Sequence, residues 1–311
     1  MDLYSFTECR LCPRRCGADR FTAGGACRTK LKYEDGRVLF PVARAALHYW
    51  EEPCISGSTG SGTVFFTGCS LGCVFCQNGA ISTGESGIYI DTDRLVRIFF
   101  ELKEQGAANI NLVTAAHVLP PVREAVAWAK EEGLDIPVLY NTSSYELREQ
   151  IRSLEGLADI YLPDLKYSSP LLAKRFSHAE DYPQVARAAI EEMVRQTGPC
   201  VFDKNGMLRR GTVVRHLVLP GCSADSKEII RYLYTTYGDD IYISIMNQYT
   251  PVERTVDIPP LNRAVRASEY DSVIEYALSI GVKNAYMQEG STADESFIPP
   301  FDHTGVLPGG N

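Results

Sequence analysis

The stretch Thr67-Gly-Cys-Ser-Leu-Gly-Cys-Val-Phe-Cys76 carries the most information in this sequence of 311 residues. It spaces Cys69, Cys73 and Cys76 as C-x3-C-x2-C, so that one short loop can reach three corners of a cubane iron–sulfur cluster. A [4Fe–4S] cluster that only transfers electrons normally has four thiolate ligands. Three thiolates leave one iron free to bind another molecule. The spacing therefore predicts a cluster that takes part in chemistry.

The composition indicates a globular protein with reduced cysteines. Hydrophobic residues make up 45% and charged residues 23% of the chain, and no apolar run approaches the ~18 residues of a membrane span. The first residues lack the basic and apolar regions of a secretory signal. A net charge of −8 argues against nucleic-acid binding. Ten cysteines without a signal favour metal ligands over disulfides. A cytoplasmic location is expected, with neither nucleic acid nor a membrane as partner.

The sequence changes character near residue 60. Residues 1–60 form a Cys-rich N-terminal extension with little periodicity, whereas apolar runs alternate with amphipathic segments in about six βα units over residues 61–298. This alternation predicts an α/β fold with parallel strands, followed by an irregular tail over 299–311. The predicted strands are 62–68, 109–114, 136–140, 159–162, 213–219 and 241–246, and the predicted helices 91–105, 121–132, 145–154, 183–196, 225–237 and 269–280. A hairpin turn is expected at 204–206.

The cysteine loop follows the first predicted strand of this series. Reactive groups in parallel barrels lie at the C-terminal ends of strands. A zinc site is the alternative, but zinc usually requires a fourth Cys or His nearby, and none follows Cys76 directly. The sequence here resembles the radical S-adenosylmethionine superfamily, whose signature C-x3-C-x-aromatic-C is matched by Cys69, Cys73, Phe75 and Cys76.

This resemblance implies a fold, a cluster and a cofactor. The fold would be a partial (β/α)6 TIM-like barrel, with a [4Fe–4S] cluster on Cys69, Cys73 and Cys76. S-adenosyl-L-methionine would bind the free iron through its amino and carboxylate groups. Reductive cleavage would give methionine and a 5′-deoxyadenosyl radical that abstracts a hydrogen atom, while the protein orients the reactants and excludes side reactions.

Within the superfamily, the sequence is similar in particular to the pyruvate formate-lyase activating enzymes and their PflX-type iron–sulfur homologues. The similarity runs from about residue 9 to residue 290 and is carried by the stretches 9–17, 51–57, 65–69, 76–78, 109–114, 162–167 and 215–221. It implies an oxidoreductase that takes a hydrogen atom from a glycine of a glycyl radical protein, with flavodoxin or ferredoxin as electron donor. A radical enzyme acting on a small molecule or another peptide is the alternative. A non-catalytic iron–sulfur module is the third.

The resemblance also places cofactor-binding groups on the second strand. The Gly-Gly-Glu motif of the activating enzymes falls on residues 114–117, which contain neither glycine nor an acid. Thr114 and Ala115 would therefore contact the cofactor's amino group mainly through backbone carbonyls. His117 fits a functional role or simple packing equally well.

Polar residues that could bind the cofactor follow on the next two strands. Asn141, Thr142 and Ser143 stand where the activating enzymes carry Asp-Thr-Asn, and the missing carboxylate argues against a bound monovalent cation. The alternative for Ser143 is to cap the next helix. Asp164 and Lys166 match the Asp-Leu-Lys of the activating enzymes and share one face of an extended segment. They would serve the cofactor or form a structural ion pair.

Four further cysteines form a second candidate site in the N-terminal extension. Cys9, Cys12, Cys16 and Cys27 are spaced C-x2-C-x3-C-x10-C, as expected for a metal-bound knuckle. Four thiols suit tetrahedral zinc or a fully ligated iron–sulfur cluster. A structural metal such as zinc is preferred, and reduced, metal-free thiols are the remaining alternative.

Overall fold

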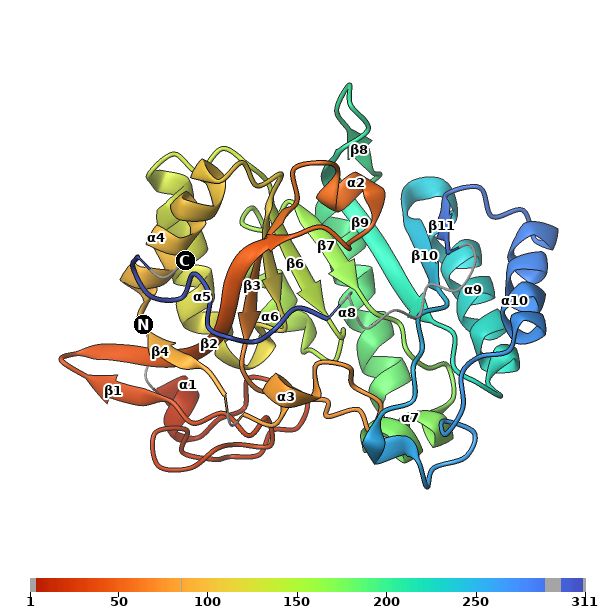
Figure 1. Ribbon diagram of the computed structural model, residues 1–311, viewed down its shortest axis with the longest axis horizontal. Coiled ribbons are helices and arrows are strands. Elements are labelled where there is room, and N and C mark those ends of the chain that lie inside the picture. The colour runs from red at the N-terminus through yellow and green to blue at the C-terminus, as the bar shows by residue number, and fades with distance from the viewer. Residues whose placement is uncertain (1–3, 85, 289–297, 310–311) are drawn as a thin grey trace.

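The computed structural model describes residues 4–84, 86–288 and 298–309 and is centred on one open sheet (Figure 1). Its parallel strands pair in the order β3 (Ser61–Phe66), β5 (Ile110–Val113), β6 (Val138–Thr142), β7 (Ile160–Pro163), β9 (Leu208–Leu217), β10 (Tyr242–Met246) and β11 (Ala285–Met287). Within the described residues the order ends at β11, so the sheet is an incomplete barrel. The predicted α/β fold with a parallel sheet is confirmed.

Helices link the successive parallel strands and cover the outer face of the sheet (Figure 1). They are α4 (Thr92–Glu104), α5 (Leu119–Glu131), α6 (Arg148–Arg152), α8 (Tyr182–Thr197), α9 (Ser223–Tyr237) and α10 (Ala267–Ser279). The short strand β8 (Val201–Phe202) pairs antiparallel with the start of β9, which confirms the predicted hairpin. Further short elements are α1 (Tyr4–Thr7), α3 (Gly79–Ser82), α7 (Pro170–Ser177), η1 (Ala116–Val118), η2 (Gly238–Asp240) and η3 (Glu253–Thr255).

Helix α4 shows how the sequence dictates these elements. The Asp91 side chain accepts a hydrogen bond from the Arg94 backbone N–H at 2.9 Å, which caps the first turn of the helix. Leu95, Ile98 and Phe99 recur at helical spacing and are fully or almost fully buried. The periodicity therefore predicts both the start of α4 and the face that packs on the sheet.

The long strand β2 (Arg37–His48) is missing from the elements predicted from the sequence. It pairs antiparallel with β3, and also with β1 (Lys32–Glu34) and β4 (Ile88–Ile90). Pro41 interrupts its sequence pattern, and the pairing shifts register between Val42 and Arg44. A proline and a bulge both mask the alternation by which a strand is recognised.

Helix α2 (Pro53–Ser56) fills the inside of the sheet at the end where the strands begin (Figure 1). Cys54 and Ile55 are buried there in one hydrophobic cluster with side chains from β6, β7 and β9, among them Leu139 and Val213. Cys54 thus acts as a buried small apolar residue. Helix α2 therefore closes this end of the interior.

The segment 298–309 crosses the inner side of the sheet (Figure 1). Phe301 packs against the buried cluster that contains Phe65 and Val113. Backbone hydrogen bonds tie the segment to β2: the Ala45 N–H donates to the Thr304 carbonyl at 2.9 Å, and a second bond joins residues 303 and 43. The C-terminal segment therefore forms part of the wall around the interior.

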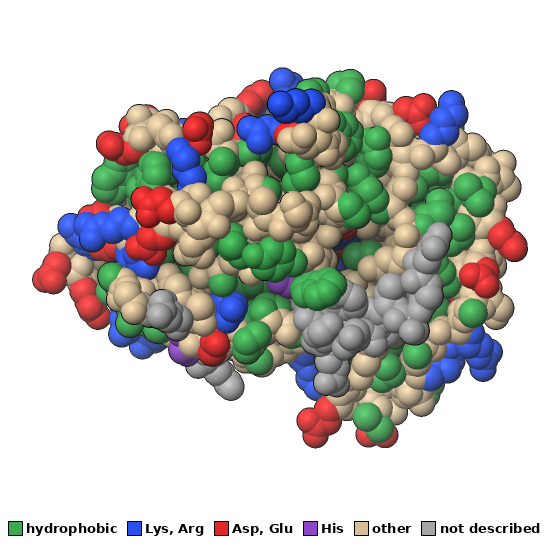
Figure 2. All heavy atoms as spheres, turned by 45° about the horizontal axis from the view of Figure 1, so that its top comes forward, with side chains coloured by type: hydrophobic (Ala, Val, Ile, Leu, Met, Phe, Trp, Pro, Cys, Tyr) green, Lys and Arg blue, Asp and Glu red, His purple; other side chains and the backbone are tan. Residues whose placement is uncertain are grey.

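One face of the molecule carries its charged side chains mostly toward the rim, whereas apolar and uncharged groups form the middle (Figure 2). No helix within the described ranges is long and apolar enough to cross a lipid bilayer.

Replacing Ile55 by alanine tests the packing of α2. Ile55 is fully buried, so Ile55→Ala should lower the free energy of unfolding by about 2–5 kcal/mol, as measured by urea denaturation. Leu171→Ala on α7 is the control, because Leu171 is 73% exposed and its loss should change stability by less than about 0.5 kcal/mol. Equal, small effects of both substitutions would contradict the burial of Ile55 between α2 and the sheet.

Candidate functional site

The cysteine loop (residues 67–76) begins with a turn that only glycine can make. Gly68 has a φ of +97°, and a Cβ atom there would lie 1.8 Å from Thr29 Oγ1. Glycine alone adopts this conformation without strain and fits the space. Beyond the turn, Cys69, Cys73 and Cys76 line one cavity of about 460 Å³ inside the sheet.

The N-terminal segment holds the cysteine loop from one side. The Arg14 guanidinium donates to the backbone carbonyls of Ser70 at 3.0 Å and Leu71 at 3.1 Å. The backbone N–H of Cys69 donates to the carbonyl of Cys27 at 3.1 Å. The residues that carry the second set of cysteines thus fix the backbone of the first.

Aromatic and polar groups from other elements also hold the loop. The Ser177 hydroxyl at the end of α7 donates to Cys73 Sγ at 3.0 Å. The Phe75 ring is buried and meets Tyr167 and Tyr249 edge to face, with ring centroids 6.4 and 6.1 Å apart. The aromatic position of the cysteine motif therefore anchors the loop in the core.

A buried cation stands beside the loop thiols. Burial raises the pKa of Cys73 to about 12 and also raises that of Cys76, while the Lys166 ammonium opposes both changes. Lys166 donates to Asp164 Oδ2 at 2.5 Å. Burial alone would lower the pKa of Lys166, but Asp164 and Cys73 hold it above its usual value. The ammonium therefore stays charged, so Asp164 and Lys166 form an ion pair and also face the cavity.

The cavity gathers most residues predicted to bind the cofactor. Its lining includes Phe75, Thr114, Asn141, Thr142, Ser143, Asp164 and Lys166. Ala115 is not among the lining residues, because the chain turns after Thr114 and buries Ala115 in the core. His117 is also buried outside the cavity, where Nε2 lies 2.7 Å from the Thr67 carbonyl. Burial, together with Arg20, lowers the pKa of His117 to about 3.

Thr114 has a backbone conformation that its residue type rarely adopts. Its φ is +60°, which strains a β-branched residue and costs about 1–3 kcal/mol. The Thr114 N–H donates to the Asn141 carbonyl at 2.9 Å. The glycine-like turn at this strand end is therefore present without a glycine, and the threonine side chain is brought to the cavity.

Thr142 lines the cavity, but its hydroxyl is already hydrogen-bonded. It donates to the Glu146 carboxylate and accepts the Ser144 N–H at 3.1 Å. Glu146 also accepts the Tyr140 hydroxyl at 2.8 Å. Burial raises the pKa of Glu146 to about 7. The hydroxyl of Thr142 thus orients the strand end, and Asn141 and Ser143 are the freer polar groups there.

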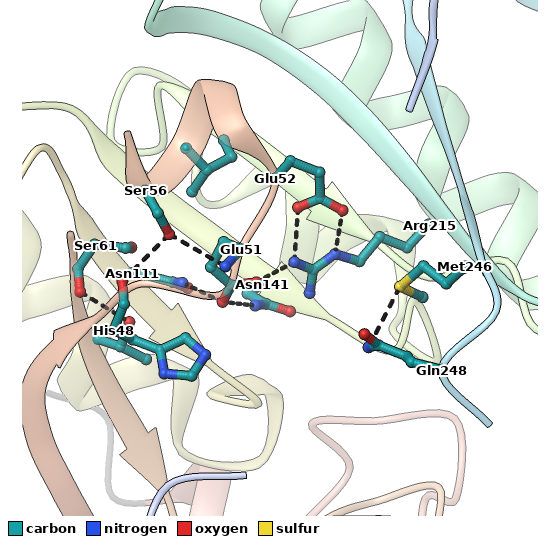
Figure 3. A network of polar contacts seen from close by, with 12 residues as sticks. His48, Glu51, Glu52, Ser56, Ser61, Asn111, Asn141, Arg215, Met246 and Gln248 are labelled. Carbon is teal, nitrogen blue, oxygen red and sulfur yellow. Dashed lines mark hydrogen bonds and ion pairs between the residues drawn. The ribbon is translucent and has the colours of Figure 1, made fainter. Parts of the chain in front are cut away.

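A buried ion cluster forms the floor of the cavity (Figure 3). We call Glu51, Glu52 and Arg215 the floor cluster. The Arg215 guanidinium donates to Glu52 through Nε at 2.9 Å and Nη2 at 2.7 Å, and it also bonds Glu51. Glu51 Oε1 further accepts the side-chain amides of Asn111 at 2.8 Å and Asn141 at 3.3 Å.

The charges of the floor cluster depend on one another. Burial would raise the pKa of Glu52, but the Arg215 guanidinium outweighs it and holds this pKa below its usual value. Arg215 and the pair Glu51 and Glu52 lie in stretches that carry the family resemblance, which assigns none of them a role in the site. The carboxylates come from the N-terminal extension, and no local pattern indicates which strand they reach.

His48 is a further lining residue that the sequence does not reveal. Its ring meets Phe65 edge to face, with centroids 6.2 Å apart. Burial lowers the pKa of His48, and Glu51 opposes the change. A single histidine in a stretch without periodicity gives no signal of its position.

The loop thiols provide the donor set of a three-thiolate cluster. Across the described residues, no three His, Cys, Asp or Glu side chains already stand in an arrangement that would hold one metal ion. The three thiols nevertheless converge on the same cavity, and its described lining contains no fourth cysteine. Their chemistry and placement therefore fit a [4Fe–4S] cluster with one iron open toward the cavity.

Comparison with known proteins identifies related sequences. Residues 63–233, more than half of the chain, match the family described as the Radical SAM superfamily. The chain is also 26% identical over 285 residues to the uncharacterized protein MJ0674 of Methanocaldococcus jannaschii, covering 88% of this chain and 75% of that protein.

Solved structures resemble the chain more distantly. Streptococcus suis SuiB bound to S-adenosylmethionine aligns with 72% of this chain and 49% of its own, at 14% identity and a TM-score of 0.47. Methylornithine synthase (PylB) aligns with 76% and 63%, at 12% identity and a TM-score of 0.45. The chain thus spans about half the length of SuiB.

Removing Arg215 tests the floor cluster. Arg215→Met leaves two buried carboxylates without a counterion, which should lower the free energy of unfolding by about 3–5 kcal/mol. Arg231→Met is the control, because it breaks an exposed pair with Glu228 that is worth about 0–1 kcal/mol. Urea denaturation at neutral pH measures both.

The pH dependence of the same variant provides a second check. In the native protein the pKa of Glu52 is lowered, so its stabilising contribution is present above the ordinary glutamate pKa and is lost as the pH falls through the lowered value. Without Arg215, protonation removes an unpaired buried charge and so stabilises the variant. The difference in the free energy of unfolding between variant and wild type should therefore become smaller at acid pH. A difference independent of pH would contradict the pairing.

Glu146 should make stability fall with rising pH. Its folded pKa of about 7 exceeds the value of about 4.3 in an unfolded chain, so stability declines between these two values. Glu146→Gln removes this titration. Between about pH 5 and about pH 8, the free energy of unfolding of the variant should therefore fall by on the order of 3 kcal/mol less than that of the wild type. Urea denaturation at the two pH values measures this difference. If the variant loses as much stability as the wild type, Glu146 is not the cause of the pH dependence.

Proposed function

This chain belongs to the radical SAM superfamily, and we propose on that basis that Cys69, Cys73 and Cys76 hold a [4Fe–4S] cluster that cleaves S-adenosyl-L-methionine reductively. Membership implies both the cluster and the cofactor. The observation that carries the proposal is the convergence of three loop thiols on one cavity whose described lining has no fourth cysteine. When bound, the reduced cluster supplies one electron for cleavage to methionine and the 5′-deoxyadenosyl radical.

The charged and polar groups of the cavity would orient the cofactor. Lys166 stays protonated beside Cys73, so its ammonium can attract the cofactor's carboxylate. Asn141 and Ser143 offer hydrogen bonds at the end of β6. Thr114 and its neighbours offer backbone carbonyls to the amino group. Helix α2 closes the opposite end of the interior and excludes water from that side.

For the substrate we propose a glycine of a glycyl radical protein, following the similarity to the activating enzymes. A small molecule or another peptide is the second candidate, and one observation favours it. Ile298 and Pro299 line the cavity together with the charged floor cluster, so the chain's own C-terminal segment narrows the space that a protein loop would need. A flavodoxin or ferredoxin as electron donor and a cytoplasmic location remain proposals.

Replacing the loop cysteines tests the proposed chemistry. After anaerobic reconstitution with iron and sulfide and reduction, the wild type should form 5′-deoxyadenosine and methionine from S-adenosyl-L-methionine. Cys73→Ser should lower this rate at least about 100-fold, since it removes a cluster ligand. Cys222→Ser is the matched control, because Cys222 is buried outside the cavity lining and should leave the rate within about twofold. Chromatography of both products measures the outcome.

Two further results separate the candidate functions. A wild type that makes neither product would refute the proposed chemistry, and an iron spectrum unchanged by the cofactor would favour the non-catalytic module. Deuterium from a labelled glycine of a glycyl radical protein should appear in 5′-deoxyadenosine only if that protein is the substrate. Product formation without such transfer would favour the second candidate.

A further inference from the structure

The four N-terminal thiols gather around one buried guanidinium. The Cys12 thiol lies within electrostatic range of Cys9, Cys16 and Cys27. Arg20 Nη1 lies 3.7 Å from Cys9 Sγ, and its charge acts on Cys16 and Cys27. Arg20 thus lies among the cysteines of this segment, although no three of their side chains already stand in an arrangement that holds one ion.

Arg20 carries a buried charge without a matching anion. Its side chain is 1% exposed and donates to the backbone carbonyls of Thr29 at 2.7 Å and His117 at 3.2 Å. Its Nη2 has no hydrogen-bond partner, and among the described residues Arg20 takes part in no ion pair. A buried, unpaired charge costs several kcal/mol. Neutral thiols do not offset this cost, whereas thiolates do.

We propose that Cys9, Cys12, Cys16 and Cys27 bind one Zn²⁺ ion and that Arg20 offsets the charge of the resulting tetrathiolate site. Binding replaces four S–H bonds by four Zn–S bonds and releases four protons to solvent, with no electron transfer. The site then carries two negative charges, one of which Arg20 balances. The exposed side chain of Cys16 gives the ion access from solvent.

The packing in this segment favours a single ion over an iron–sulfur cluster. A Cβ atom at Gly25 would lie 3.1 Å from both Arg20 Cδ and Cys16 Sγ, so the guanidinium already fills the space beside the thiols. Zinc needs sulfur atoms about 2.3 Å from one centre, and a single ion takes less room beside Arg20 than a cubane.

The zinc site would brace the catalytic loop. The Cys27 carbonyl accepts the N–H of Cys69. Arg14, which lies between Cys12 and Cys16 in the sequence, holds the loop carbonyls of Ser70 and Leu71. Ordering the N-terminal thiols on an ion would therefore fix the loop that carries the other three cysteines.

Metal analysis of a variant without the loop cysteines tests the site independently of the radical chemistry. With Cys69, Cys73 and Cys76 all changed to Ser, the purified chain should retain about one zinc per chain and no iron. Adding Cys12→Ser and Cys27→Ser should abolish the zinc, whereas Cys54→Ser, at a buried single cysteine, should not. Bound iron in place of zinc, or zinc that survives loss of Cys12 and Cys27, would overturn the proposal.

Cobalt and chelator titrations of the intact chain cover the case in which the cysteine variants fail to fold. Co²⁺ added to metal-free wild type should give thiolate-to-metal charge-transfer absorption, and its absence would refute the site. Arg20→Gln should weaken zinc binding about 10–100-fold in competition with a chromophoric chelator. Arg10→Gln, at an exposed arginine paired with Glu8, should not change it. Equal affinities of the two variants would refute the role of Arg20.

Discussion

The pairing of Arg215 with Glu51 and Glu52 is the interaction on which the interior depends. It joins a segment before the first parallel strand to β9, and through Asn111 and Asn141 to β5 and β6. Such a cluster is stable only when every charge has its partner. It therefore fixes where α2 closes the sheet, and with it the depth of the cavity that the cysteine loop faces.

The N-terminal segment acts at both ends of this cavity. At the floor it supplies the two carboxylates, and at the mouth Arg14 and the Cys27 carbonyl hold the backbone of the cysteine loop. Strand β2 connects these two regions along β3. The cysteine loop is thus positioned by residues that precede the parallel sheet in sequence, and its geometry is coupled to the order of that segment.

Local patterns account for what could be predicted from the sequence. The spacing of the loop cysteines and the periodicity of segments such as α4 report on neighbours along the chain. The periodicity predicts a helix that is present, and the three cysteines line one cavity. Glu51, Glu52 and His48 enter the cavity through tertiary pairing, which leaves no local signal. Thr142 has the polarity expected of a cofactor ligand, but its bond to Glu146 depends on a burial that spacing does not reveal.

Thr114 shows why the superfamily is clearer than the substrate. The activating enzymes carry glycine at this strand end, and the threonine here keeps a glycine-like φ of +60° at a cost of about 1–3 kcal/mol. A fold accepts that strain only where the surrounding structure over-determines the turn. A backbone carbonyl keeps its place when the side chain of the same residue changes, whereas a contact made by the side chain is lost. Membership of the superfamily therefore does not determine which substrate the side chains of this cavity contact.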